Sequence, residues 1–132
     1  MFILGDKSNI VIQYKKKTVV GLVEPVKVTG PTGRSREVLA RIDSGATKSS
    51  VDVRLAAELS LGPILKAKIV KSASGKSLRP VVEAKIVFAD KEFKSEFTIA
   101  DRADMKYSML IGQNILNKGY LIDPTKEIPK GR

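Results

Sequence analysis

The chain has 132 residues, enough for one domain with a modest hydrophobic core. Hydrophobic residues make up 42% of it and charged residues 29%, which is ordinary for a soluble globular protein. No apolar run approaches the roughly 20 residues of a membrane-spanning helix, and Phe2-Ile3-Leu4 is too short for the apolar core of a signal peptide. We therefore expect a cytoplasmic protein with no membrane partner.

The sequence contains no cysteine and no histidine. This excludes disulfides, thiol nucleophiles, catalysis by Ser-His or Cys-His pairs, and zinc sites built from nitrogen and sulfur ligands. An enzyme made from this chain must use carboxylates, Lys, Tyr or Ser side chains, or a metal held by oxygen ligands.

Lys and Arg number 24 against 14 Asp and Glu, which gives a net charge of +10. Such an excess favours an anionic partner, such as nucleic acid, an acidic peptide or an acidic membrane surface, although it also serves general solubility. Aromatic residues make up only 5% of the chain and Trp is missing, so stacking platforms for single-stranded nucleic acid are poor.

The first third of the chain predicts short strands. We expect a strand at residues 9–13, strand pieces at 18–28 broken at Gly21 and Pro25, a turn at 30–34 and a strand at 37–43. The last strand alternates between two faces. Its side chains are Val38, Ala40 and Ile42 on one face, and Leu39, Arg41 and Asp43 on the other.

The rest of the chain continues this pattern with two short helices. Asp52 is expected to cap a helix at residues 53–59, and a second helix is expected at 113–118. The predicted strands are 68–72, 78–88, 92–99, 109–111 and 119–123. Residues Ser74, Gly75 and Lys76 form the predicted tip of a hairpin, and the tail after Pro124 is expected to be loose. Short strands separated by frequent turns indicate a small barrel or sandwich.

The segment Asp43-Ser44-Gly45-Ala46 carries the candidate chemistry, because an apolar alternating strand runs into a turn there. Two close carboxylates share one proton, so one can activate a water molecule while the other protonates or polarises a scissile carbonyl. The hydroxyl of Ser44 can hydrogen-bond to nearby backbone, Gly45 permits close approach of the chain, and Ala46 fits a crowded site. The tripeptide Asp-Ser-Gly alone is common in turns, so the surrounding sequence decides whether it indicates a catalytic site.

Four segments in order resemble the one-lobe, retropepsin-like aspartic peptidases, and most closely the branch called ATP-dependent zinc proteases, which is found beside glutamate ligases in bacteria. They are Gly21-Leu22-Val23-Glu24-Pro25-Val26, Ala40-Arg41-Ile42-Asp43-Ser44-Gly45-Ala46, Asp101-Arg102 with Met105, Tyr107 and Met109-Leu110-Ile111-Gly112, and Leu121-Ile122-Asp123-Pro124.

The resemblance implies a mainly β fold, a single closed β-barrel lobe with one or two short helices. It divides the chain into an arm at 1–20, a peptidase domain at 21–124 and a polar tail at 125–132. It also implies an aspartic endopeptidase, active as a homodimer in which two copies of Asp43 meet. We expect this enzyme to work without a metal or cofactor. The hairpin at Ser74, Gly75 and Lys76 would be a flap over a peptide or protein substrate. The three residues Leu110, Ile111 and Gly112 would lie behind the active site.

The chain departs from its relatives at two points. The branch name includes zinc, yet His and Cys are missing, so we take the name as uninformative. Relatives often carry Arg after the Leu-x-Gly glycine, where this chain has Gln113, so an ion pair made by that Arg is missing or supplied by Arg41 or Arg102.

Two other functions stay open from the sequence. A basic β-barrel could bind nucleic acid, with Asp43 merely in a turn, or a peptidase-like dimer could serve as an inactive scaffold. Asp101 and Arg102 are expected to be structural, because charged pairs of this kind usually fix loops. The basic excess suggests that a peptide substrate is acidic.

Overall fold

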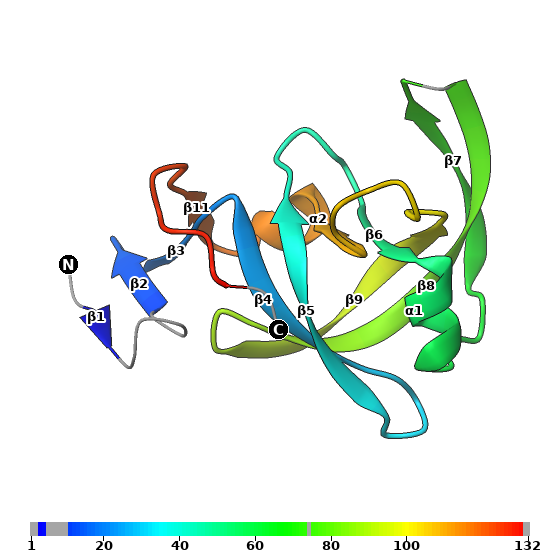
Figure 1. Cartoon of the computed structure of the whole chain (residues 1–132), viewed down its shortest axis with the longest axis horizontal. Coiled ribbons are helices and arrows are strands. Elements are labelled where there is room, and N and C mark those ends of the chain that lie inside the picture. Colours follow the sequence, from blue (N-terminus) through cyan, green and yellow to red (C-terminus); the bar gives the residue numbers. More distant parts are fainter. Residues whose placement is uncertain (1–2, 5–10, 74, 131–132) are drawn as a thin grey trace.

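A computed structural model describes residues 3–4, 11–73 and 75–130 (Figure 1). Within these ranges the chain is built of short strands and two short helices, which confirms the mainly β class. The elements are β1 (Ile3–Leu4), β2 (Val11–Tyr14), β3 (Lys17–Val20), β4 (Val23–Thr29), β5 (Ser35–Ile42), β6 (Ser49–Asp52), α1 (Val53–Glu58), β7 (Lys66–Ser72), β8 (Gly75–Phe88), β9 (Lys91–Ala100), β10 (Met109–Ile111), α2 (Gln113–Leu116) and β11 (Tyr120–Ile122).

The larger sheet closes into a barrel. Its strands run in the order β4-β5-β10-β6-β9-β8, and β8 also pairs with β4, so the sheet has no free edge along this circuit. Most neighbours are antiparallel, but β10 is parallel to β5 and β6 is parallel to β9. Figure 1 shows β4, β5, β8 and β9 crossing around a common centre. This closed barrel confirms the predicted fold.

The barrel interior holds the hydrophobic core. The alternation predicted for β5 is confirmed, because Ala40 and Ile42 are buried while Arg41 is exposed. The largest fully buried side chains include Phe88, Phe97, Leu59, Ile86, Met109, Ile111 and Ile115. Burying each such side chain stabilises the fold by about 1.5–3 kcal/mol.

A smaller sheet, of order β1-β2-β3-β11, flanks the barrel. Part of the strand predicted at 9–13 forms β2, while residues 9 and 10 lie outside the described part of the chain. Tyr120 of β11 connects this sheet to the barrel, since its ring lies 4.8 Å from that of Phe88 and its hydroxyl donates to the Phe88 carbonyl. Burial raises the pKa of Tyr120 to about 12.

The sequence predicted that Pro25 breaks the strand, and this prediction is wrong. Pro25 lies within β4, opposite Leu39 of β5. The pairing of β4 with β8 begins only at Val26, so Pro25 occupies a stretch that lacks a neighbour on that side. A missing N–H is tolerated at such an edge position.

The expectation of a loose tail is also wrong at Lys126. Its ammonium lies 2.6 Å from the carboxylate of Glu24, and both side chains are largely buried. The chain at residues 123–126 is further held by an N–H of Lys126 that donates to the carbonyl of Asp123. Residues 131–132 of the predicted tail lie outside the described residues.

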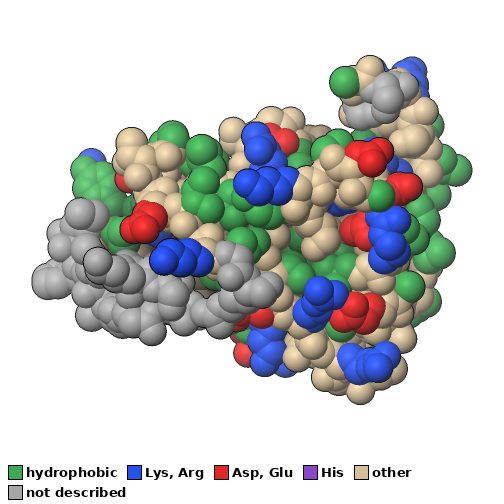
Figure 2. Space-filling model, viewed as in Figure 1, with side chains coloured by type: hydrophobic (Ala, Val, Ile, Leu, Met, Phe, Trp, Pro, Cys, Tyr) green, Lys and Arg blue, Asp and Glu red, His purple; other side chains and the backbone are tan. Residues whose placement is uncertain are grey.

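The hairpin of β7 and β8 extends away from the barrel. Figure 1 shows it rising beside the barrel, and in Figure 2 its end stands clear of the rest of the surface. Its pairing joins Ser72 to Gly75 and Lys71 to Lys76, so Gly75 and Lys76 already belong to β8. The hairpin is therefore where the sequence predicts it, with Ser74 itself outside the described residues. No helix in the described part of the chain is long and apolar enough to cross a membrane.

Candidate active site

Asp43 lies directly after β5, at the start of a loop that returns to β6. Its N–H donates to the carbonyl of Ile111 at 2.9 Å, which continues the parallel pairing of β5 with β10. Its Oδ1 accepts the N–H of Gly45 at 2.9 Å, and its carbonyl accepts the N–H of Ala46 at 3.2 Å. Asp43 is half-buried, while Ser44 is exposed. The loop thus orients the Asp43 carboxylate through main-chain bonds.

Gly112 allows the loop to pack against β10. A Cβ atom on this residue would lie 2.7 Å from the carbonyl oxygens of both Ala46 and Lys48. Both contacts are with backbone, which cannot move aside as the end of a flexible side chain can. The N–H of Gln113 then donates to the Ala46 carbonyl at 2.7 Å. Only glycine permits this approach between the two segments.

The side chain of Gln113 fastens the exposed end of the loop. Its Nε2 donates to the Ser44 carbonyl at 2.7 Å, one residue after Asp43. From the sequence, this position was noted only because relatives often carry Arg there. The structure gives it a partner of its own, because an amide donor can bind a neutral carbonyl without a second charge. The Leu-x-Gly motif is the sequence signal that identifies Gln113, which directly follows its glycine.

Ser49 and Asn114 form a buried hydrogen-bond cluster under the loop, and neither was singled out from the sequence. The Oδ1 of Asn114 accepts both the N–H and the hydroxyl of Ser49 at 2.8 Å. The Ser49 hydroxyl oxygen accepts the N–H of Gly112 at 2.9 Å. The Asn114 amide donates to Ser95 Oγ and to the Glu96 carbonyl. This cluster joins β6, β9 and α2 beneath Asp43.

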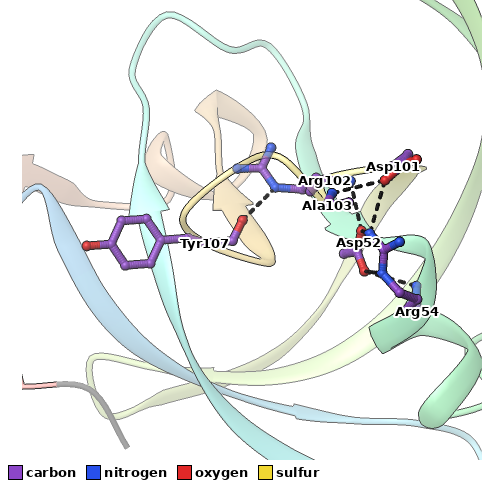
Figure 3. Close-up of polar contacts among 6 residues, drawn as sticks. All are labelled: Asp52, Arg54, Asp101, Arg102, Ala103 and Tyr107. Carbon is purple, nitrogen blue, oxygen red and sulfur yellow. Dashed lines mark hydrogen bonds and ion pairs between the residues drawn. The ribbon is translucent and has the colours of Figure 1, made fainter.

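Asp52 caps α1, as the sequence predicts (Figure 3). Its carboxylate accepts the backbone N–H and two guanidinium N–H groups of Arg54, and the backbone N–H of Arg102 at 2.8 Å. Burial alone would raise the pKa of Asp52, but the hydrogen bonds from Arg102 and Arg54 outweigh it and lower the pKa. The carboxylate is thus fully engaged in structure.

Asp101 and Arg102 bind different partners, although they are adjacent. Asp101 Oδ1 accepts from Arg54 Nη2 at 3.0 Å. Arg102 donates from Nε to the Tyr107 carbonyl at 2.9 Å and from Nη1 to the Ser50 hydroxyl at 3.3 Å. Figure 3 shows the Arg102 side chain extending away from Asp52, toward the carbonyl of Tyr107. Both residues therefore hold the segment that leads into β10.

Several charged groups act on Arg102, and Asp43 is one of them. Burial lowers the pKa of Arg102, and repulsion from Arg79 and Arg41 lowers it further, while Asp52 and Asp43 act in the opposite sense. Arg41 lies two positions before Asp43 on β5, and strand alternation therefore puts it on the same face. The guanidinium groups of Arg41 on β5 and Arg79 on β8 thus act on Arg102, in the segment before β10.

Two surface cavities of the described part of the chain lie elsewhere. One is lined by residues that include Glu24, Glu37 and Lys126, the other by residues that include Gly30, Pro63 and Lys94. Among the described residues, no three Asp, Glu, His or Cys side chains gather where they could hold a metal ion. The described residues therefore do not offer the ligand set of a zinc site.

Solved structures of similar fold are proteases or of unknown function. A search of curated proteins finds no match. A Legionella pneumophila protein of unknown function, Lpg0085, matches with a TM-score of 0.56 and 20% identity over 83% of this chain and 95% of its own. The EIAV protease complexed with the inhibitor HBY-793 matches with a TM-score of 0.60 and 15% identity over 80% of this chain and 92% of its own. At these identities the likeness shows the fold.

A comparison with sequence families matches residues 54–131 to the family described as RimB-like, retropepsin-like aspartic endopeptidase RimB. The matched stretch begins after Asp43 and includes α1, the β7–β8 hairpin and the Leu110-Ile111-Gly112 segment. It covers more than half of the chain and agrees with the barrel fold. The chain belongs to the RimB-like family of retropepsin-like aspartic endopeptidases.

Proposed function

We propose that this protein is a homodimeric aspartic endopeptidase in which each subunit contributes one Asp43 carboxylate. The observation that carries the proposal is the geometry at Asp43, a half-buried residue at a strand end whose loop is fixed by main-chain bonds to Gly45 and Ile111. Ser44 and Ala46 belong to the same loop, and Leu110, Ile111 and Gly112 support it from behind. Membership of an aspartic endopeptidase family supports the same chemistry.

In the proposed reaction the two Asp43 carboxylates share one proton and hold a water molecule between them. The ionised carboxylate takes a proton from the water as the oxygen attacks the scissile carbonyl carbon, and the protonated one gives its proton to the carbonyl oxygen. The tetrahedral intermediate then breaks its C–N bond. The amide nitrogen receives the proton taken from water, and the second carboxylate recovers its proton from a hydroxyl of the intermediate.

The proposal requires a second subunit. The chain has one Asp-Ser-Gly segment, and the cavities described above are lined by residues other than Asp43. A substrate cleft therefore forms when a partner adds its wall and its carboxylate. The hairpin around Gly75 and Lys76, which extends away from the barrel, is proposed to close over the bound peptide.

We propose an acidic peptide as substrate. The net charge of +10 attracts anionic segments, Arg41 shares a strand face with Asp43, and the pKa of Arg102 responds to the charges of Arg79, Arg41 and Asp43. Guanidinium groups bind carboxylates with paired N–H donors, so they favour Asp or Glu side chains near the scissile bond. On the face in Figure 2, by contrast, basic and acidic side chains are interspersed, which gives a nucleic-acid backbone no continuous track there.

Two finer features of the proposal rest on the sequence motifs. Residues 21–124 would carry the peptidase chemistry, with 1–20 as an N-terminal arm and 125–132 as a polar tail. The motifs from Gly21 to Pro124 also support a place near the ATP-dependent zinc protease branch, without its metal.

A cleavage assay on a peptide library, run across pH, tests the proposal. Asp43→Asn is expected to abolish cleavage while leaving folding and dimerisation intact. The matched control is Asp90→Asn, which removes one carboxylate from an exposed turn between β8 and β9 and should cleave like the wild type. Retained cleavage by Asp43→Asn would overturn the assignment. Specific activity should also fall on dilution, and a rate strictly proportional to subunit concentration through the dissociation range would contradict a shared site.

A further inference from the structure

Glu96 of β9 binds two lysines through the same carboxylate oxygen. Lys48 Nζ donates to Glu96 Oε1 at 2.8 Å, and Lys66 Nζ lies 3.3 Å from that oxygen. The hydrogen bond from Lys48 lowers the pKa of Glu96 most, and Lys66 lowers it further. One carboxylate therefore joins two cations from distant parts of the chain.

One lysine belongs to the Asp43 loop and the other to the hairpin. Lys48 ends the loop that begins at Asp43, and its carbonyl packs against Gly112. Lys66 is the first residue of β7, the outer strand of the hairpin, where it pairs with Val81 of β8. Glu96 thus lies between the end of the catalytic loop and the base of the hairpin.

The main chain of Glu96 is tied to the same loop. Its carbonyl accepts the Asn114 amide at 3.0 Å, and Asn114 Oδ1 binds Ser49, the residue after Lys48. Glu96 is consequently fixed relative to the loop by main chain and side chain together. Its contact with Lys66 is the part that reaches the hairpin, and it is the more exposed of the two pairs, with the Lys66 side chain 55% exposed. A contact of that kind can break and re-form at little cost.

We propose that Glu96 is a positioning residue that couples the base of the β7–β8 hairpin to the Asp43 loop. While both lysines are bound, the hairpin base and the end of the loop keep one relative position. Release of Lys66 removes this restraint, so the loop and the hairpin base each fluctuate more. This role rests on the proposed function only in its effect on cleavage, because the mechanical link itself is independent of catalysis.

Hydrogen–deuterium exchange on the Asp43→Asn background tests the link without substrate or self-cleavage. Lys66→Met alters only the hairpin side, yet it is expected to speed exchange of the loop amides at 44–48 about two- to fivefold. Lys48→Met is expected to speed exchange of the amides at 66–72 by a similar factor. Glu96→Gln should speed exchange in both segments. The double variant Glu96→Gln with Lys66→Met should show the same exchange rates in the hairpin as Glu96→Gln alone.

The controls separate coupling from general loosening. Glu92→Gln removes a carboxylate from the same strand whose partner, Lys85, lies on β8 away from the loop. It should leave loop exchange unchanged, and Lys66→Arg, which keeps the cation, should behave like the wild type. Salt near 1 M should raise the exchange rates of the wild type close to those of Glu96→Gln, because salt screens partly exposed ion pairs. Unchanged loop exchange in Lys66→Met, or an equal effect of Glu92→Gln, would overturn the proposal.

With Asp43 restored, cleavage gives a second readout. Glu96→Gln is expected to raise KM for peptide about two- to fivefold with little change in kcat, because hairpin closure acts on binding. A fall in kcat alone at constant KM would contradict the coupling. If exchange shows the link while the wild type cleaves no peptide, the coupling stands and the proposed function fails. If the wild type cleaves peptide and exchange shows no link, the proposed function stands and the coupling fails.

Discussion

Lys126 and Glu24 form a largely buried ion pair, in which Nζ lies 2.6 Å from Oε2 and the exposed fractions are 15% and 8%. The same oxygen accepts the N–H of Gly21 at 2.7 Å. The pair joins the segment after β11 to the start of β4. It therefore fastens the proposed C-terminal tail to the start of the proposed peptidase domain.

Replacement of Lys126 by Met is expected to lower the free energy of unfolding by about 3 kcal/mol. The substitution keeps the aliphatic contacts but leaves the Glu24 carboxylate buried with only the Gly21 N–H. Urea unfolding at neutral pH measures the change. Lys130→Met, at an exposed position, serves as the control. A loss below about 0.5 kcal/mol would mean that water already solvates the Glu24 carboxylate.

Asp52 predicts a particular dependence of stability on pH. Because its pKa in the folded protein is lowered from 3.8, it stabilises the fold fully above about pH 4 and loses this contribution as the pH falls through the lower folded value. Asp52→Asn should therefore be less stable than the wild type at pH 7 by about 2 kcal/mol, and the gap should narrow in acid. Unfolding curves at pH 7, 4 and 2.5 test this. Asp90→Asn should show no such narrowing, and a constant gap for Asp52→Asn would contradict the prediction.

Gln113 should influence cleavage more than stability. Gln113→Ala removes the donor to the Ser44 carbonyl, which water can replace because this end of the loop is exposed. We expect a stability change below about 1 kcal/mol but about a tenfold loss of kcat, because small displacements of a catalytic group are costly. Gln113→Glu is the matched comparison, since it keeps the size and loses the donor. Full activity of both variants would show that the main-chain bonds alone position Asp43.

Arg79 offers a test of substrate charge. Arg79→Gln should raise KM for peptides with Glu beside the scissile bond about tenfold and leave neutral peptides within about twofold, since a charge-assisted contact contributes roughly 1.5 kcal/mol. Arg34→Gln, on the exposed turn after β4, removes the same charge at a distance from Asp43. Equal effects of the two variants would assign the preference for acidic peptides to net charge rather than to this residue.

Local patterns in the sequence predicted most of the fold. The alternation of β5, the cap at Asp52 and the turn at 30–34 each depend on neighbouring residues, and each is confirmed. The break expected at Pro25 was wrong because the outcome depends on which strand lies beside it. The looseness expected at Lys126 was wrong because its partner, Glu24, is distant in sequence.

The candidate site shows the same division. Asp43 and the glycine of Leu110-Ile111-Gly112 can be found from short motifs, and their roles stay predictions. The Ser49–Asn114 cluster and the Glu96 bridge cannot be found that way, because each unites residues from three elements through contacts that only the closed barrel creates. Polar residues of these types are common in loops, so their types alone carried no signal.

The parallel pairing of β5 with β10 has a consequence for biosynthesis. Asp43 depends on the Ile111 carbonyl and on Gln113 for its position, and both are made long after it. At about 5–20 residues per second, the ribosome adds the intervening chain over about 3 to 14 s. During that interval the growing chain carries the aspartate without the scaffold that orients it. Under the proposed function, a nascent subunit is therefore unable to cut itself or its neighbours on the polysome.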